Sequence, residues 1–236
     1  MTSKLKELCD TVCKISAKAG EILLREYTNN GDPENAAIAS NNLITTLLSD
    51  LHLPAFIITP ITDPAPFNLR EKSMVWLVHP LDGIEAFSTN NNEFTINIAL
   101  IVKGDPALGV IHQPTTNLTW WAYTNGGGWR TDSTKTTTRL YSNSIDITQP
   151  GLRIVIQPDI PLPSGYVYPQ ITKVWSSLKF VMVAEGIEDV CPQNNDDEPE
   201  WSVAAGHIII KESGRKTSEC IKYNTRELLV QKFIIL

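Results

Sequence analysis

The stretch VWLVHPLDGIEAF, residues 75–87, decides the predicted fold. Its first four residues are apolar, which favours a buried β-strand, and Pro80 ends that run. After Asp82 and Gly83, residues 84–87 can form the first turn of a helix. Unpaired backbone N–H groups and the positive end of the helix dipole make such a junction favourable for an anion. An acidic residue there needs a cation beside it, so the stretch also predicts a metal-assisted phosphate site.

The residues that surround this stretch predict a layered α/β fold. Apolar residues recur every three or four positions in two segments that precede it, so we expect amphipathic helices over residues 3–28 and 41–51. Apolar runs of strand length are expected at 55–59, 94–102, 108–112 and 118–123. Two helices followed by a run of mainly antiparallel strands differ from the regular βαβ alternation of a doubly wound sheet.

The second half of the chain follows a polar, Thr- and Ser-rich segment, residues 130–150, which is expected to be a loop or a seam. We interpret the chain as a single unit, 1–236, with an N-terminal α+β half over 1–130 and a C-terminal α/β half over 131–236. The second half is expected to contain a strand and two helices, at 153–156, 175–184 and 201–212. Gly214 is placed to end the last helix.

Composition and charge exclude several classes of function. The net charge of −6 argues against a nucleic-acid partner, because no Lys/Arg stripe is visible. No apolar run approaches the roughly 18 residues of a membrane span, and the charged N-terminus lacks the apolar region of a signal peptide. Four cysteines without a disulfide or zinc-ligand pattern fit a reducing compartment. We therefore expect a soluble, cytoplasmic protein without a membrane partner.

Four segments, taken in order, resemble the inositol monophosphatase superfamily. WLVHPLDGIEAF resembles the family's strand–D-P-L-D-G-T–helix signature, and NEFTINIALIVKGDPALGVIHQPTTN resembles the strand pair that follows it. WSSLKFVMVAEG and EWSVAAGHIIIKESG resemble the later S-S-L-K-F…A-E-G and W-D-x-A-A-G-H helices. Order and spacing are those of the family, and the segments look most similar to its 3′(2′),5′-bisphosphate nucleotidase (CysQ-type) branch.

The resemblance implies a five-layer α-β-α-β-α sandwich of the inositol monophosphatase and fructose-1,6-bisphosphatase type. It also implies a magnesium-dependent, typically lithium-sensitive phosphatase that acts on small phosphomonoesters. In this family, carboxylates from several segments hold the Mg²⁺ ions, which neutralise the phosphate and generate the attacking water. The implied ligand is a small phosphorylated molecule, either a nucleotide bisphosphate or an inositol phosphate, and the implied assembly is a monomer or homodimer.

Position by position, most of the family's metal-binding carboxylates are substituted in this chain. Three Asp positions hold Asn41, His79 and Ser202, the S-E-E segment is T-P-I around Pro60, and the Thr that orients the water is Ile84. Asp82 and the backbone carbonyl of Leu81 are the implied metal ligands that remain. Because Mg²⁺ demands near-octahedral oxygen coordination, one carboxylate leaves too few ligands and too little charge. We therefore expect weak or no Mg²⁺ binding and a catalytically degraded homologue, a pseudoenzyme.

The substrate contacts that the resemblance implies are partly retained. They are Gly83, Ile84, Ser176, Ser177 and Lys179. Gln193 stands where the nucleotidases have an arginine, which removes one nucleotide contact. The carboxylates that would repel a phosphate are missing, while the helix N-terminus at Gly83 and Ile84 remains. The sequence therefore favours metal-independent binding of a small phosphorylated ligand.

Two other interpretations stay open. The first is an active bisphosphate nucleotidase with a rearranged metal site, for example His79, Asp82 and Glu85 with Asp63. Phosphate release that requires Mg²⁺ and is blocked by lithium would identify it. The second is a non-enzymatic scaffold or regulatory partner that binds another protein through its sheet or helix faces.

Several residues also have a purely structural interpretation. Asp82 can cap a helix, His79 can pack at a strand end, and Lys179 can keep its charged head in water. The acidic run NNDDEPE, residues 194–200, is interpreted as a solvated loop. The side chains expected to serve packing alone are Trp120, Trp121, Trp129, His112 and His207.

Overall fold

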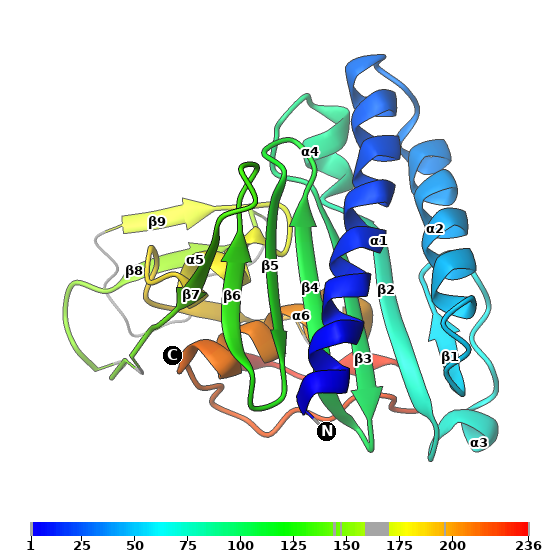
Figure 1. The fold of residues 1–236 in the computed structure, drawn as a ribbon. Helices are drawn as coiled ribbons and strands as arrows, with labels where there is room; N and C mark the ends of the chain where they lie inside the picture. The colour runs from blue at the N-terminus through cyan, green and yellow to red at the C-terminus, as the bar shows by residue number, and fades with distance from the viewer. Residues whose placement is uncertain (1, 144, 147, 159–169, 196, 236) are drawn as a thin grey trace.

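The structure is a computed structural model that describes residues 2–143, 145–146, 148–158, 170–195 and 197–235. A seven-stranded sheet runs through its centre, with the strands side by side in chain order (Figure 1). The strands are β1 (Ala55–Ile58), β2 (Met74–Asp82), β3 (Thr95–Val102), β4 (Asp105–Gln113), β5 (Leu118–Tyr123), β6 (Gly127–Thr131) and β7 (Thr137–Leu140). β1 and β2 are parallel, and every later pair of neighbours is antiparallel.

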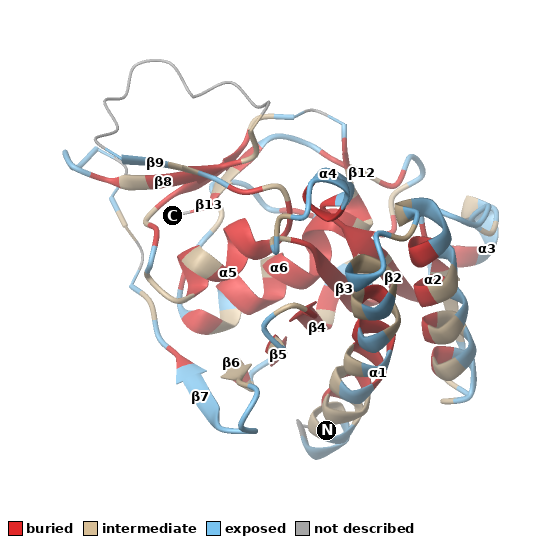
Figure 2. Ribbon diagram, turned by 90° about the horizontal axis from the view of Figure 1, so that it is seen from above, coloured by how far each residue is buried: buried red, intermediate tan, exposed pale blue. Residues whose placement is uncertain are grey.

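Helices cover both faces of this sheet, which confirms the predicted mixed α/β fold (Figure 1, Figure 2). On one face lie α1 (Thr2–Thr28) and α2 (Pro33–Ser49), and on the other lie α5 (Leu178–Ala184) and α6 (Glu200–Ser213). Side chains along β2 alternate between the two cores, as the two-residue period of a strand requires. Trp76 and Val78 belong to the core beneath α1 and α2, whereas Val75 and Leu77 belong to the core beneath α5 and α6.

Short strands form a further layer beyond α5 and α6. They pair as β8 (Arg153–Ile156) with β9 (Gln170–Lys173), β10 (Cys191–Gln193) with β13 (Phe233–Ile235), and β11 (Glu198–Pro199) with β12 (Leu229–Val230). The remaining helices, α3 (Phe67–Arg70) and α4 (Ile84–Ser88), flank β2. Within the described ranges the order of layers is helix, sheet, helix, strand. The fifth, helical layer of the expected sandwich is not present among the described residues.

The predicted start of the second helix at residue 41 is wrong by eight residues. α2 begins at Pro33, because Asp32 caps it and its carboxylate accepts a hydrogen bond of 2.9 Å from the backbone N–H of Asn35. Proline at the first helical position has the backbone φ that a helix needs. The residues that follow α1, 29–33, therefore also contain the start of α2, and the connection between the two helices is short.

The prediction of a loop over residues 130–150 is also wrong for its first part. β6 and β7 extend the sheet through this segment, and Thr131 pairs with Thr137 across their turn. β-branched threonines fit the half-exposed edge of a sheet, so a Thr-rich composition is compatible with strands as well as with loops. Among the helices that the structure describes, none is both long and apolar enough to span a membrane.

Three of the side chains that were expected to pack, Trp120, Trp121 and His112, are buried. Trp120 is buried in the core beneath α5 and α6, where its indole N–H donates to Glu185 Oε1 at 2.8 Å. His112 is buried with Nδ1 2.9 Å from Thr119 Oγ1, and burial lowers its pKa to about 4. A Cβ on Gly20 would lie 2.7 Å from His112 Nε2, so the glycine allows α1 to approach β4 closely.

Candidate functional site

The junction between Asp82 and Gly83 lies where β2 ends and α4 begins, as the sequence predicts. Asp82 pairs with Thr95 of β3 after an irregularity that follows His79. Gly83 has a φ of 88°, and a Cβ there would lie 3.2 Å from Cβ of Ser176. Glycine is therefore required both for the turn and for the approach of the segment before α5. α4 has five residues, so little helix dipole accumulates along it.

Asp82 is the centre of a buried hydrogen-bond network. Its Oδ2 atom accepts from the backbone N–H of Ser177 at 2.8 Å, from Ser177 Oγ at 2.6 Å and from Asn97 Nδ2 at 2.9 Å. Thr95 Oγ1 lies at 3.5 Å from the same oxygen. Ser177 Oγ also lies 3.0 Å from the carbonyl oxygen of Ser202, but its single proton serves the shorter contact to the carboxylate. This oxygen of Asp82 is thus saturated by protein donors.

His79 lies on the other side of the carboxylate. Its Nδ1 atom is 3.7 Å from Asp82 Oδ1 and 3.3 Å from Ser202 Oγ. Both contacts meet the same ring nitrogen, so the three side chains do not form a relay in which a histidine joins an acid and a hydroxyl through opposite nitrogens. Burial lowers the pKa of His79, although the charges of Asp82 and Glu198 act in the opposite direction. The imidazole is therefore neutral at pH 7.

The carboxylate of Asp82 stays ionised despite its burial. Burial alone would raise the pKa of Asp82, but the charges of His79 and Lys179 and the hydrogen bonds from Ser177 and Asn97 lower it below its usual range. Since His79 is neutral at pH 7, the charge that acts there is that of Lys179. The network and the lysine together hold a negative charge in the interior.

Lys179 is buried, which corrects the interpretation of a lysine with its head in water. The residue is 3% exposed, and Nζ lies 5.1 Å from the centroid of the Phe180 ring. Its hydrogen bond to Gln157 Oε1 is 3.5 Å long, at the outer limit for such a contact. No ion pair of Lys179 is present within the described ranges. An ammonium group with three donors therefore has spare hydrogen-bonding capacity.

The substituted positions divide into buried and exposed ones. Asn41 lies on α2 and is 2% exposed, and its Oδ1 atom has no hydrogen-bond partner in the described part of the chain. The neighbouring Ser40 donates to the carbonyl oxygen of Pro80 at 2.9 Å, so α2 is joined to β2 beside Asp82. Ser202 is buried next to His79, whereas Pro60 and Ile84 are exposed.

The donor set at Asp82 does not fit the Mg²⁺ ions that the resemblance implies. Within the residues that the structure describes, no group of three His, Cys, Asp or Glu side chains could hold a metal ion. Asp82 has only Oδ1 free of strong hydrogen bonds, and its neighbours Asn97, Ser177 and Ser202 are neutral. A magnesium pair requires several charged oxygen ligands in octahedral geometry. We therefore derive no catalytic step through a metal ion.

Of the acidic residues proposed for a rearranged site, Glu85 and Asp63 are exposed, and the charge of another acid, Glu198, acts on His79. The run at 194–200 is not wholly solvated, since Glu198 is 8% exposed and Glu200 is fully buried. The negative charge of Glu198 acts to raise the pKa of His79, against the larger effect of burial. The Glu198 carboxylate itself accepts no hydrogen bond from a described residue. Glu200 instead accepts from Asn224 and Thr225 at the start of α6, a structural role.

Sequence reasoning missed Asn97 as a member of this site. Asn97 lies in the middle of the apolar run of β3 and is 1% exposed. A polar residue in a strand of that composition is a signal, because a buried amide requires hydrogen-bond partners. The partners are Asp82 and Ser177. Gln193 is also buried, and its Nε2 donates to Cys191 Sγ at 3.2 Å while Oε1 has no partner among the described residues.

Comparison with known proteins finds one family over nearly the whole chain. The sequence profile of the inositol monophosphatase family matches residues 4–232. The 3′(2′),5′-bisphosphate nucleotidase CysQ of Buchnera aphidicola is 30% identical over 227 residues, which are 89% of this chain and 84% of that protein.

Solved structures show the same fold. The crystal structure of CysQ from Bacteroides thetaiotaomicron superposes with a TM-score of 0.78 and 25% identity, and the match covers 94% of this chain and 93% of that one. The structure of SaIMPase-II with 2′AMP bound has a TM-score of 0.78 and 16% identity, and it covers 98% of this chain and 88% of that one. The second likeness concerns the fold alone.

Proposed function

Because the chain belongs to the inositol monophosphatase family, we propose that it is a catalytically degraded member that binds a small phosphorylated ligand without Mg²⁺. A nucleotide bisphosphate is the first candidate, because the relatives named above include CysQ nucleotidases. An inositol phosphate is the second, because a relative of the same fold has inositol monophosphate bound.

The surroundings of Asp82 support the first part of this proposal, that the chain is catalytically degraded. An oxygen that accepts three hydrogen bonds of 2.6–2.9 Å has little capacity left for a metal ion. The residues beside it are neutral amides, hydroxyls and an uncharged imidazole. Removing one stabilising group from an active site costs about 10²- to 10³-fold in rate, so the combined losses leave negligible turnover.

Lys179 supports the second part of the proposal, that the chain binds a small phosphorylated ligand without Mg²⁺. A buried ammonium with one long hydrogen bond is a favourable partner for a phosphate oxygen, because charge-assisted hydrogen bonds are strong away from water. The loop around the Asp82–Gly83 junction would complete the contact with the phosphate. Its residues are Gly83 and Ile84, with Ser176 next to Gly83. Ser177 already donates both its N–H and its hydroxyl to Asp82, so it contributes by holding that carboxylate in place.

Calorimetry in the presence of EDTA tests this proposal. Adenosine 3′,5′-bisphosphate, an inositol phosphate and inorganic phosphate are each titrated into the protein. We expect at least one to bind, with an affinity that EDTA leaves unchanged and that Lys179→Gln weakens about ten- to hundredfold. Lys14→Gln, at an exposed position on α1, is the matched control. If none of the three compounds gives a heat of binding, the proposal is wrong.

Glu198 favours a second candidate, an active phosphatase with a rearranged site. A buried carboxylate whose charge acts on His79 could provide a charge that the family's own positions lack. Under this hypothesis the protein releases phosphate from the bisphosphate nucleotide in a reaction that requires Mg²⁺ and is blocked by lithium. Glu198→Gln would then abolish release while Glu34→Gln, at an exposed position of α2, would not. No release by the unmodified protein excludes this candidate.

A further inference from the structure

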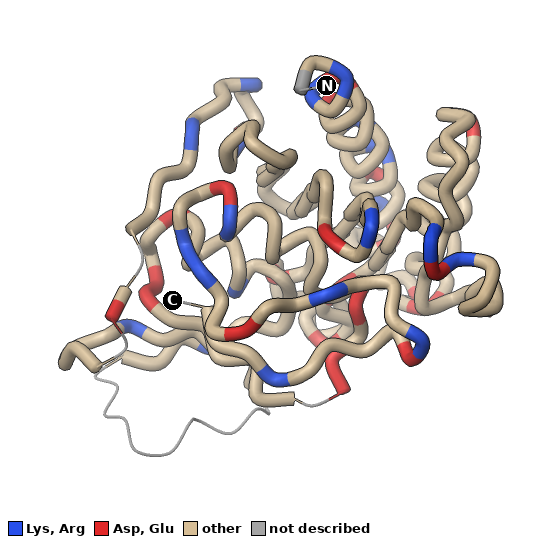
Figure 3. Tube along the Cα trace, turned by 90° about the horizontal axis from the view of Figure 1, so that it is seen from below, with Lys and Arg blue, Asp and Glu red and all other residues tan. Residues whose placement is uncertain are grey.

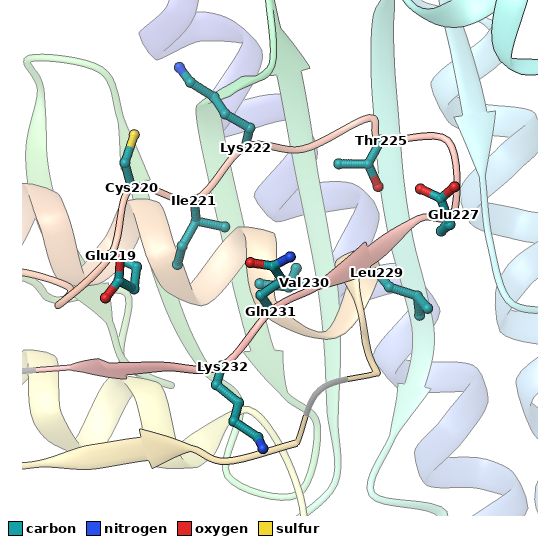
Figure 4. Close-up of a pocket in the computed structure, with 10 residues that line it drawn as sticks. All are labelled: Glu219, Cys220, Ile221, Lys222, Thr225, Glu227, Leu229, Val230, Gln231 and Lys232. Atoms are coloured by element: carbon teal, nitrogen blue, oxygen red, sulfur yellow. The ribbon is translucent and has the colours of Figure 1, made fainter.

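Outside the surroundings of Asp82, a groove of about 790 Å³ lies along the C-terminal segment. Its walls are two extended stretches, residues 219–225 and 229–232 (Figure 4). Acidic and basic residues are interspersed along this segment (Figure 3), and the groove is lined by two glutamates and two lysines, Glu219, Glu227, Lys222 and Lys232. Two of its apolar residues, Ile221 and Val230, are 7% and 3% exposed. The lining of this groove therefore favours no single class of ligand.

A second cavity, which we name the α1 cleft, has a more selective lining. Its volume of about 760 Å³ is within the roughly 300–1,000 Å³ that is usual for ligand sites. One wall is α1, which contributes residues 6, 10, 13, 14 and 17 from one side of the helix. The other wall is the face of β5, β6 and β7 on the side of α1. No described helix covers β6 and β7 on this face, so the cleft is open to solvent (Figure 1, Figure 2).

Two tryptophans form the apolar part of the α1 cleft. Trp121 and Trp129 are paired across β5 and β6, and their rings stack with centroids 5.7 Å apart. Trp121 is 5% exposed, whereas Trp129 is only partly buried and presents the larger surface. Both indole N–H groups are used inside the protein, by Thr131 Oγ1 at 3.1 Å and by the carbonyl oxygen of Gly126 at 2.9 Å. The rings therefore offer carbon surface and no hydrogen bonds, which favours an apolar and especially an aromatic group.

Both acidic residues of the α1 cleft are engaged by the protein itself. Asp10 forms an ion pair with Lys6, whose Nζ lies 2.6 Å from Oδ1. Asp132 is held within its own turn, where Oδ1 accepts three hydrogen bonds of 2.6–3.0 Å from residues 134–136. A cationic ligand would have to displace one of these sets of contacts.

Two lysines of the α1 cleft lack such partners. Lys14 lies on α1 and Lys135 lies in the turn between β6 and β7, and both are exposed. Neither forms an ion pair with a described residue. With Lys6, three lysines and two aspartates line the cleft, so its lining has a net positive charge. Charge complementarity therefore favours an anion.

We propose that the α1 cleft binds a small aromatic acid, a ligand in which an anionic group is attached directly to a flat apolar body. The anionic group would lie between Lys14 and Lys135, which supply charge-assisted hydrogen bonds. The apolar body would lie on Trp129, because contacts between aromatic rings stabilise beyond the area that they bury. The phosphorylated ligands proposed for the surroundings of Asp82 differ from this class, since inositol has no apolar body and a ribose separates the base of a nucleotide from its phosphates. The inference does not depend on the function proposed for Asp82.

Titration with 1-naphthoate, followed through the tryptophan indole N–H signals in nuclear magnetic resonance spectra, tests the proposal. The chain has six tryptophans, and Trp121→Phe and Trp129→Phe identify the two signals that belong to the α1 cleft. We expect 1-naphthoate to shift these two signals more than the other four. The neutral 1-naphthylmethanol should bind about tenfold more weakly, because it lacks the charge that the two exposed lysines attract. The cation 1-naphthylmethylamine should bind more weakly still.

Variants of the two lysines separate this site from non-specific binding of an apolar compound. Lys14→Gln combined with Lys135→Gln should weaken the binding of 1-naphthoate about tenfold and leave that of 1-naphthylmethanol unchanged. Lys72→Gln with Lys211→Gln, at exposed positions outside the cleft, removes the same charge and is the matched control. The proposal is overturned if 1-naphthoate shifts neither signal, if the acid and the alcohol bind equally, or if both double variants weaken binding equally.

Discussion

The surroundings of Asp82 and the groove along residues 219–222 satisfy their polar groups in opposite ways. At Asp82, donors from β3 and from the start of α5 converge on one carboxylate oxygen. Along 219–222, four consecutive residues make no backbone–backbone hydrogen bond within the described part, and the rim carboxylates of Glu219 and Glu227 have no ion pair. Oδ2 of Asp82 is saturated by the protein's own donors, whereas the backbone of residues 219–222 leaves its donors and acceptors to solvent.

The difference indicates how function can move within a family fold. A polar group that is satisfied internally gives little net free energy on binding a ligand, because an existing hydrogen bond must be exchanged. A backbone edge that faces water can gain main-chain hydrogen bonds to a partner without breaking internal ones. Under the proposed function, the residue that resembles a metal ligand, Asp82, therefore has a structural role, whereas the backbone of residues 219–222 has hydrogen-bonding capacity that the described residues do not use.

Removal of the Asp82 carboxylate should have the largest effect on stability. Asp82→Ala removes the acceptor that the Ser177 backbone N–H, the Ser177 hydroxyl and the Asn97 amide share, and it leaves Lys179 without its nearby negative charge. We expect a loss of about 3–5 kcal/mol in the free energy of unfolding, as for other broken buried charge networks. Chemical denaturation measures this. In a site built to hold metal ions, removing one of several repelling carboxylates would instead stabilise the metal-free protein, so a gain in stability would contradict the structural role.

Acid should destabilise the packed part of the molecule through His112. Its pKa is about 4 when folded, against an ordinary value near 6.5, so the unfolded chain takes up a proton first as the pH falls. The contribution to stability is present above about pH 6.5 and is lost between about 6.5 and 4, by roughly 3 kcal/mol in total.

The variant His112→Gln should remove that share of the pH dependence. Denaturation curves at pH 7 and pH 4.5 compare it with the unmodified protein. His52→Gln, at an exposed position, serves as the control and should leave the pH dependence as it is. An unchanged slope in His112→Gln would show that the imidazole has the same pKa in the folded and the unfolded state, which contradicts the prediction.

Gly109 tests the packing that holds α6 beside Asp82. A Cβ at this position would lie 2.6 Å from Ile208 Cγ2 and 2.8 Å from the backbone oxygen of Ala205. Gly109→Ala should therefore displace α6 and destabilise the protein by about 1–3 kcal/mol. Thermal unfolding measures the effect, and Thr138→Ala on the exposed edge of β7 is expected to change stability by less than about 0.5 kcal/mol. Equal stability of the two variants would mean that α6 is not closely packed on β4.

The smallest effect is expected in the groove. Glu219→Ala removes a carboxylate that has no ion pair with a described residue, so stability should change by less than about 0.5 kcal/mol. The amides at 219–222 should exchange faster than those of β3, because no backbone acceptor protects them. Hydrogen exchange of the free protein provides this measurement. Slow exchange at 219–222 would contradict the contrast between the two regions.

Most elements of the fold could be predicted from the sequence because their signals are local. The spacing of apolar residues predicts α1, and the largely apolar run of residues predicts β3. In both cases the signal lies within the element itself. The early start of α2 was missed because a run of breaker residues, ended by Asp32 and Pro33, both ends one helix and caps the next. β7 was missed because Thr-rich strands and Thr-rich loops have the same composition.

The sequence by itself determined which chemical groups are present at the family's metal positions. The resemblance predicts from the sequence alone that Asn41, His79 and Ser202 stand where the family has carboxylates. It also placed Asp82 at the end of a strand before a glycine, and the structure has this junction.

Only the tertiary structure decided what Asp82 contacts. Asn97 is 15 residues away in the chain and Ser177 is 95 residues away, yet both donate to the same oxygen. The burial of Lys179 and Glu198 and the free backbone edge at 219–222 have the same origin. Local patterns report the period of an element and the type of its residues, whereas the partner of a buried charge or of a strand edge is set by the packing of elements that are distant in sequence.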